Sequence, residues 1–153
     1  WLVMNKLAKP DYGDVVVIGI TGETNYIKRV IGLPGDTICI DDDVVYRKRK
    51  GETEFTPLDE PYAYYSTAKK HEKYAATIVP EGKIFVLGDN RYESKDSRSP
   101  DVGTRDITAV IGVVPEWAIK RKSNITSYYN VVMKIDNFIL GLFGAKADNG
   151  RNK

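Results

Sequence analysis

The sequence is poor in the residues that most often build reactive or metal-binding sites. Among its 153 residues there are one cysteine, Cys39, and one histidine, His71. A single cysteine excludes an internal disulfide and any metal site built from several thiolates, and Cys39 within "TICID" reads as a small buried strand residue. His71 lies in the charged stretch "AKKHEKY", which is typical of a solvated loop, so the pattern argues against a histidine-dependent triad or zinc site.

An excess of charge of one sign and a long apolar run are also missing. The chain has 23 basic and 21 acidic residues, so its net charge gives no argument for binding nucleic acid. No apolar run reaches the ~18 residues that a membrane-spanning helix needs. The length fits one domain. The chain begins "WLVMNK" rather than with an initiator methionine, so we expect it to be a fragment of a longer polypeptide.

The periodicity of the remaining sequence predicts a mainly β domain of antiparallel sheet. The stretches at 13–20 and 26–33 are β-branched and are joined by a short polar loop, which indicates a hairpin. "DTICI" and "VVYRK" flank "DDD" as a second hairpin, 82–89 reads as a strand, and 109–119 reads as a last strand pair or bent strand. Residues 51–79, rich in proline, tyrosine and charge, are expected to form an extended excursion.

The C-terminal region has a different character. Apolar residues from Val131 to Phe143 recur at helical spacing with polar residues opposite them, and Gly144 follows as a natural stop. We therefore divide the chain into a β domain at 1–122 and a C-terminal amphipathic helix and tail at 123–153. The apolar face of this helix fits docking on the core, a membrane surface or a partner, and the sequence leaves the three open.

One segment places positive charge inside an apolar run. In "YIKRVIGLPGDTI", residues 26–38, a solvated lysine on an edge strand is the simpler interpretation of Lys28. The alternative is an amine kept away from water, because burial disfavours the ammonium form and lowers the pKa. Along a strand, Tyr26 and Val30 share the face of Lys28, whereas Ile27 and Arg29 face the other way.

A second segment gathers polar residues directly after an apolar strand. "GDNRYESKDSR", residues 88–98, follows "KIFVL" and holds carboxylates, arginines, serines and an asparagine. A long charged loop would explain this composition. If the loop is even partly buried, its charged groups must be paired with one another or with the rest of the protein.

Taken together, the two segments resemble bacterial type I signal peptidases, the membrane-anchored serine proteases that remove signal peptides. The resemblance runs from about "MNK" near residue 5 to about residue 119. It is carried by "GDVVVI", "YIKRVIGLPGD", "DEPYAYY", "VPEGKIFVLGDNR" and "SKDSR", in the order and approximate spacing of the family. The short excursion is more similar to the Gram-positive type. The resemblance implies a signal-peptidase-like β fold and a Ser/Lys dyad that needs no metal and no cofactor.

Residue roles follow from the resemblance position by position. Lys28 matches the general base, and Ser94 matches the serine whose hydroxyl orients the lysine amine. A base that works near pH 7 needs a pKa far below the ordinary lysine value of about 10.4, which an apolar environment favours. The resemblance further implies two structural ion pairs and three residues that line the pockets for small substrate side chains. The ion pairs are Arg29 with Asp89 and Asp96 with Arg98. The pocket residues are Val17, Tyr26 and Ile27.

The family's nucleophile belongs to a Ser-Met-x-Pro segment that lies upstream of the position matched by Asn5 and Lys6. All six serines of this chain follow Lys28. We therefore expect the fragment to be inactive, with its nucleophile and N-terminal membrane anchor encoded before Trp1. One alternative is a non-catalytic homologue that binds peptides as a chaperone in pilus or surface-protein assembly. Another is a self-cleaving repressor-type peptidase, against which "GDNRYESKDSR" argues.

The resemblance also implies partners and a location. The substrates would be signal peptides of exported preproteins, cleaved after Ala-x-Ala at the outer face of the cytoplasmic membrane, and no nucleic acid is expected. The tail carries Ala145-Lys146-Ala147 after an apolar stretch, which has the shape of a cleavage region. We expect that this tail could occupy the groove of its own or a neighbouring molecule and cause self-association.

Overall fold

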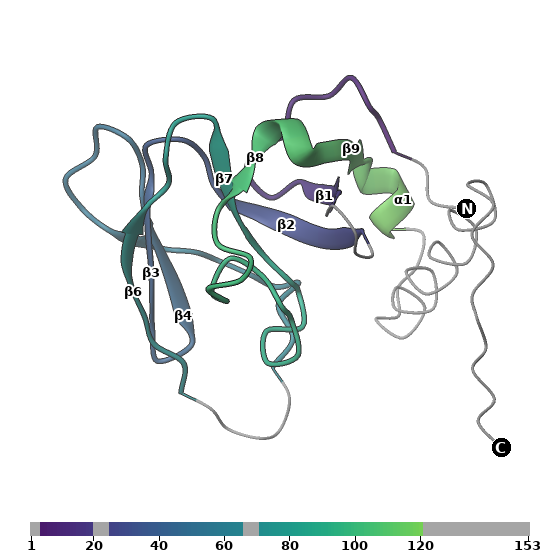
Figure 1. The fold of residues 1–153 in the computed structure, drawn as a ribbon. Helices are drawn as coiled ribbons and strands as arrows, with labels where there is room; N and C mark the ends of the chain where they lie inside the picture. The colour runs from purple at the N-terminus through teal and green to yellow at the C-terminus, as the bar shows by residue number, and fades with distance from the viewer. Residues whose placement is uncertain (1–3, 20–24, 66–70, 121–153) are drawn as a thin grey trace, which may run out of the picture.

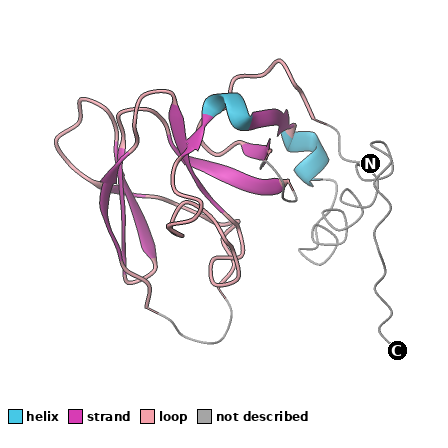
Figure 2. Cartoon of the chain, viewed as in Figure 1, coloured by secondary structure: helices cyan, strands magenta, loops and turns pink. Residues whose placement is uncertain are grey.

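Antiparallel strands make up most of the regular structure in the computed structural model, which describes residues 4–19, 25–65 and 71–120 (Figures 1 and 2). In chain order the elements are β1 (Val15–Ile18), β2 (Tyr26–Gly32), β3 (Thr37–Asp41), β4 (Val44–Lys48), β5 (Thr56–Pro57), β6 (Tyr74–Ile78), β7 (Lys83–Leu87), β8 (Arg105–Asp106), the 3-10 turn η1 (Ile107–Ala109), β9 (Val110–Val114) and α1 (Glu116–Lys120). The predicted mainly β, antiparallel class is confirmed, because all the strand pairings within the two sheets are antiparallel.

The strands form two sheets that lie side by side in Figure 1. The first has the order β8-β7-β2-β1-β9 and the second has the order β5-β4-β3-β6. In the first sheet, β2 lies between β1 and β7, so a residue of β2 has neighbours on both sides. In the second, β3 and β4 form a hairpin whose turn places Asp42 and Asp43 at φ of 51° and 68°. This left-handed geometry matches the twist of the paired strands.

A shared apolar core joins the two sheets. Phe85 and Leu87 of β7 pack with Ile31 of β2 and with Ile38 and Val45 of the second sheet. Because all five side chains are buried, the two sheets hold each other in place through this cluster. Apolar clusters on the first sheet extend the core, one around Val16 and Val30 and one around Val15 and Val17.

Two parts of the chain differ from the expected elements. The excursion at 51–79 is not only a loop, because it contributes the strands β5 and β6, which form the two edges of the second sheet. The stretch expected to be strand up to residue 119 divides into β9 and the short helix α1. This helix starts because the Pro115 carbonyl accepts the backbone N–H groups of Ala118 and Ile119.

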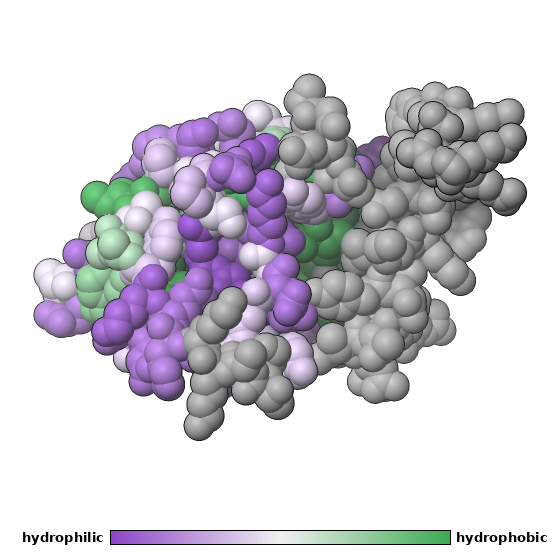
Figure 3. Space-filling view, turned by 60° about the horizontal axis from the view of Figure 1, so that its bottom comes forward, coloured by the Kyte–Doolittle hydropathy of each residue, from purple (hydrophilic) through white to green (hydrophobic). Residues whose placement is uncertain are grey.

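The C-terminal predictions lie outside the described residues. These are the amphipathic helix at 131–143, the domain division after residue 122 and the tail Ala145-Lys146-Ala147. Within the part of the chain that the structure describes, no helix is long and apolar enough to cross a membrane. The face seen in Figure 3 is mostly hydrophilic, with hydrophobic surface in separate areas.

Candidate active site

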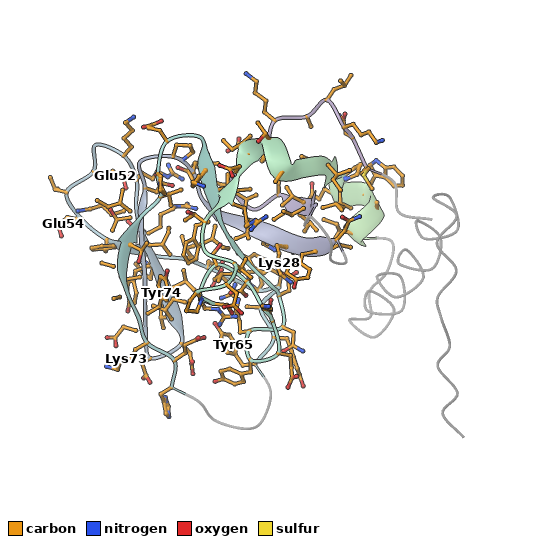
Figure 4. All side chains as sticks on the ribbon, viewed as in Figure 1. Lys28, Glu52, Glu54, Tyr65, Lys73 and Tyr74 are labelled. Carbon is orange, nitrogen blue, oxygen red and sulfur yellow. The ribbon has the colours of Figure 1, made fainter. Side chains whose placement is uncertain are left out.

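Lys28 lies on β2 with its side chain partly buried. It is the register partner of Val16 on β1, and its Nζ lies 5.1 Å from the centre of the Tyr26 ring. Figure 4 shows Lys28 and Tyr65 on the same side of β2. Burial lowers the pKa of Lys28 below its ordinary value, the Asp96 carboxylate raises it, Arg98 lowers it and Asp89 raises it again. Desolvation has the largest effect, so the amine is held in a place that favours its neutral form.

Gly88 brings Ser94 and Lys28 to one place. A methyl group built on Gly88 would lie 2.1 Å from Ser94 Oγ and 3.7 Å from Lys28 Nζ. The Ser94 hydroxyl therefore rests against the bare Cα of Gly88, close to the lysine amine. This hydroxyl is buried and has no hydrogen-bond partner among the described residues. A buried hydroxyl without a partner is costly, so its presence beside an amine calls for a functional explanation.

The peptide of Gly88 is held by the turn that follows it, because Asp96 is completely buried and its Oδ2 accepts the Gly88 N–H at 2.9 Å. Arg98 donates to both oxygens of the same carboxylate at 2.8 Å. Ser97 continues the arrangement, since its Oγ accepts the Val86 N–H at 2.9 Å and its own N–H donates to Val86 O. Residues 96–98 thus bind Val86 and Gly88 at the C-terminal end of β7, beyond the two residues of β7 that pair with β8.

Arg29 and Asp89 connect β2 to the start of the same turn. The guanidinium donates to both carboxylate oxygens, at 2.9 and 2.6 Å, and to the Gly13 carbonyl at 2.8 Å. Arg29 lies 3.8 Å from the centre of the Tyr62 ring and is only 8% exposed. A bidentate, stacked arginine of this kind fixes geometry, which fits a structural more than a chemical role. The structure therefore brings together both ion pairs named from the sequence.

Comparison with known proteins identifies the family of the chain. The family model described as "Signal peptidase, peptidase S26" matches residues 1–119. The chain belongs to that family. It is 42% identical over 89 residues to a signal peptidase I of Bacillus licheniformis, covering 57% of this chain and 48% of that protein. It is 35% identical over 117 residues to a signal peptidase IB of Staphylococcus aureus, covering 67% of this chain and 57% of that protein.

The fold of this signal peptidase family member is also similar to a solved structure. A signal peptidase I from Enterococcus faecalis V583 matches with a TM-score of 0.56 and 31% identity, over 71% of this chain and 98% of that one. The predicted signal-peptidase-like β fold is therefore confirmed. The chain spans about half the length of the curated relatives it matches.

The three residues expected to line substrate pockets lie at one end of the β1–β2 hairpin. Val17 and Ile27 are register partners and pack together on one face of the sheet. Tyr26 lies on the other face, beside Lys28. Val17 is buried, whereas Tyr26 and Ile27 are partly exposed. Substrate contact by these three residues stays a prediction.

The sequence interpretation missed a buried ion pair beside the site. Arg91 is 2% exposed and donates to both carboxylate oxygens of Glu60 at 2.7 Å, while the Glu60 side chain is 7% exposed. The Arg91 Nε donates to the Gly88 carbonyl at 3.2 Å. Both residues stand in stretches that carry the family resemblance, "DEPYAYY" and "GDNR". The only sequence signal for the pair is the rule that a buried arginine needs a carboxylate, and that rule does not say which carboxylate.

The hydroxyls of Ser94 and Ser97 are not open to a substrate. Ser94 Oγ is buried against Gly88, and Ser97 is buried with its hydroxyl accepting the Val86 N–H. Their placement fits support of the site better than nucleophilic attack. Across residues 4–19, 25–65 and 71–120, no three His, Cys, Asp or Glu side chains are grouped so that they could hold a metal ion. Cys39 lies on β3, partly exposed rather than buried as expected.

Proposed function

We propose that this chain is the catalytic β domain of a signal peptidase I, a serine endopeptidase that removes signal peptides from exported preproteins after Ala-x-Ala. One observation carries the proposal: a partly buried lysine amine and a buried hydroxyl, which has no hydrogen-bond partner among the described residues, both lie next to Gly88. The family match and the relatives named signal peptidase I support the same activity. The location that follows from this proposal is the outer face of the cytoplasmic membrane.

In the proposed mechanism, the neutral amine of Lys28 takes the proton from a serine hydroxyl supplied by the upstream segment. The serine oxygen attacks the scissile carbonyl, and the resulting ammonium of Lys28 gives its proton to the leaving amine. Lys28 then activates the water that hydrolyses the acyl-enzyme. In this mechanism Ser94 orients the amine. We expect the 153-residue chain alone to be inactive, because all its serines follow Lys28.

The test uses the longer polypeptide that carries the natural upstream sequence, with a synthetic signal peptide ending in Ala-x-Ala as substrate. We expect cleavage after the second alanine, identified by mass spectrometry, and its loss in Lys28→Met. Lys73→Met is the matched control, because Lys73 is exposed, pairs with Asp41 on the second sheet and lies away from Lys28 in Figure 4.

Two results would contradict the proposal. Full activity in Lys28→Met would show that the lysine is not the base. A longer polypeptide that binds the peptide but leaves it intact would favour the chaperone-like alternative. The proposed self-association through Ala145-Lys146-Ala147 is tested separately, by deleting residues 144–153 and measuring the mass of the particle in solution; an unchanged mass would exclude it.

A further inference from the structure

Residues 60–65 lie along the backbone of the turn at residues 88–91. Tyr64 donates its N–H to Asp89 O at 2.7 Å, and Arg91 donates its N–H to Tyr64 O at 2.9 Å. Tyr64 and Asn90 form a parallel bridge. Residues 60–65, which we call the strap, are thus bound along the backbone of the turn at 88–91.

The strap contacts Arg91 through the Glu60 carboxylate and Arg29 through the Tyr62 ring. Glu60 accepts two hydrogen bonds from Arg91 and one from the Tyr62 hydroxyl, the last at 2.9 Å. The Tyr62 ring in turn lies against the Arg29 guanidinium at 3.8 Å. Glu60 is therefore the single charged group of the strap that reaches Arg91 directly and Arg29 through a tyrosine.

Arg91 carries this connection to Gly88. Its Nε donates to the Gly88 carbonyl, while the Gly88 N–H donates to Asp96. The N–H and the carbonyl of this residue are thus both fixed, and Ser94 Oγ and Lys28 Nζ both lie within 4 Å of the place that a Cβ on Gly88 would take. An arginine this deeply buried cannot lose its charge, so it keeps its place only while a carboxylate faces it.

We propose that Glu60 is a positioning residue for Lys28, which acts by holding Arg91 against the Gly88 carbonyl and so fixes the surface on which Ser94 and the lysine amine meet. The role assigned to Lys28 rests on the proposed function. If Glu60 loses its charge, the buried guanidinium must recruit water or move outward. In both cases the turn loosens at Gly88, and water reaches the lysine amine.

The consequence is a change in how Lys28 titrates. Because desolvation is the main cause that lowers the pKa of this lysine, entry of water moves the pKa back toward its ordinary value. Below that pKa, each unit of increase lowers the neutral fraction of the amine about tenfold. A residue that only stabilised the fold would lower the melting temperature without this shift.

The experiment measures the Lys28 pKa in the 153-residue chain by following its 13Cε resonance against pH, with the resonance assigned by its absence in Lys28→Met. We expect the pKa to rise in Glu60→Gln. Two controls should leave it unchanged. Glu81→Gln removes an equivalent charge from an exposed pair with Lys50, and Ile40→Val weakens the core of the second sheet.

An unchanged Lys28 pKa in Glu60→Gln overturns the assignment, because it shows that Glu60 has a purely structural role. A lowered Lys28 pKa also overturns it, because it shows a direct effect of the unpaired Arg91 charge. Should Glu60→Gln not fold, Glu60→Asp takes its place, since it keeps the charge but shortens the reach to Arg91; a smaller rise is expected, and no rise overturns the assignment. The titration needs no cleavage. Failure of the proposed peptidase function in the longer polypeptide is therefore a separate result.

Discussion

Replacing Gly88 by alanine is the sharpest test of the site's packing. The added methyl group would lie 2.1 Å from Ser94 Oγ and 2.5 Å from Ser94 Cβ, far inside van der Waals contact. Rotating the Ser94 hydroxyl removes the first conflict but not the second, so the backbone of the turn has to move. The backbone of Gly88 is not in the left-handed region, so alanine adds no conformational strain of its own.

Overpacking of this kind typically costs about 1–3 kcal/mol of unfolding free energy. We expect a loss in that range for Gly88→Ala, measured by urea denaturation of the 153-residue chain. The longer polypeptide should also lose cleavage activity, because the displaced turn carries Ser94 away from Lys28. Gly19→Ala is the matched control: it adds the same methyl group at the end of β1, where the nearest atom of Ile111 is at an ordinary 3.4 Å.

A double variant separates packing from chemistry. Gly88→Ala combined with Ser94→Gly removes both conflicting atoms, so much of the lost stability should return. Cleavage activity should not, because the hydroxyl beside the amine is gone. If Gly88→Ala unfolds at the same urea concentration as Gly19→Ala and keeps its activity, then Ser94 does not rest on Gly88 and the arrangement of the site described above is wrong.

Three further predictions concern single side chains. Burial lowers the pKa of Lys28 in the folded chain below the value of 10.5 in the unfolded chain. At pH values below the folded pKa, Lys28→Met should therefore stabilise the fold by about 1.4 kcal/mol for each unit by which that pKa is lowered, and this gain should vanish as the pH rises to 10.5. Urea denaturation across this pH range measures the gain, and a gain that does not depend on pH would contradict the prediction. Ser94→Ala, which removes a buried hydroxyl without a partner, should raise the unfolding free energy by about 1 kcal/mol while lowering cleavage by the longer polypeptide, and a loss of stability would speak against this view of the hydroxyl. Phe85→Ala should lower the unfolding free energy by about 3–5 kcal/mol, since Phe85 is fully buried between the sheets. Phe55→Ala, at a side chain that is 38% exposed, should lower it far less. Equal denaturation midpoints for the two variants would refute this account of the core.

The first hairpin was predictable because two β-branched runs are joined by a short polar loop. In β1 all four residues are buried, and β2 has its three partly exposed residues, including Lys28, at one end. The turn at "DDD" was equally readable, because aspartate tolerates the positive φ that a tight hairpin turn requires. These elements carry enough local information to be placed without their neighbours.

Other elements were not predictable, because their structure comes from partners far away in the chain. In β6, Ala75, Ala76 and Ile78 are exposed, so the strand has no alternation of apolar and polar residues and is defined only by pairing with β3. In β5 there are two residues, one of them Pro57, at the edge of the sheet, where a missing N–H is tolerated. The pattern from 109 to 119 is apolar apart from Glu116 and so does not separate strand from helix by its periodicity.

The candidate site shows the same division. Lys28, Ser94, Arg29 and Asp89 were named because a family resemblance covers the two segments that hold them. Glu60 was not named, although it lies in a stretch that carries the same resemblance. Its partner Arg91 lies 31 positions further along the chain, and no local pattern indicates a pairing over that distance.

The Glu60–Arg91 pair is better explained by position than by stability. Replacing a buried ion pair by apolar side chains of similar volume is often neutral or stabilising, whereas removing one partner is strongly destabilising. Two apolar side chains would fill the same space beside Gly88. They would not donate to the Gly88 carbonyl, as the Arg91 Nε does, nor accept the Tyr62 hydroxyl, as Glu60 does. The charged pair is therefore the arrangement that fills the core and also fixes the peptide on which Ser94 and Lys28 meet.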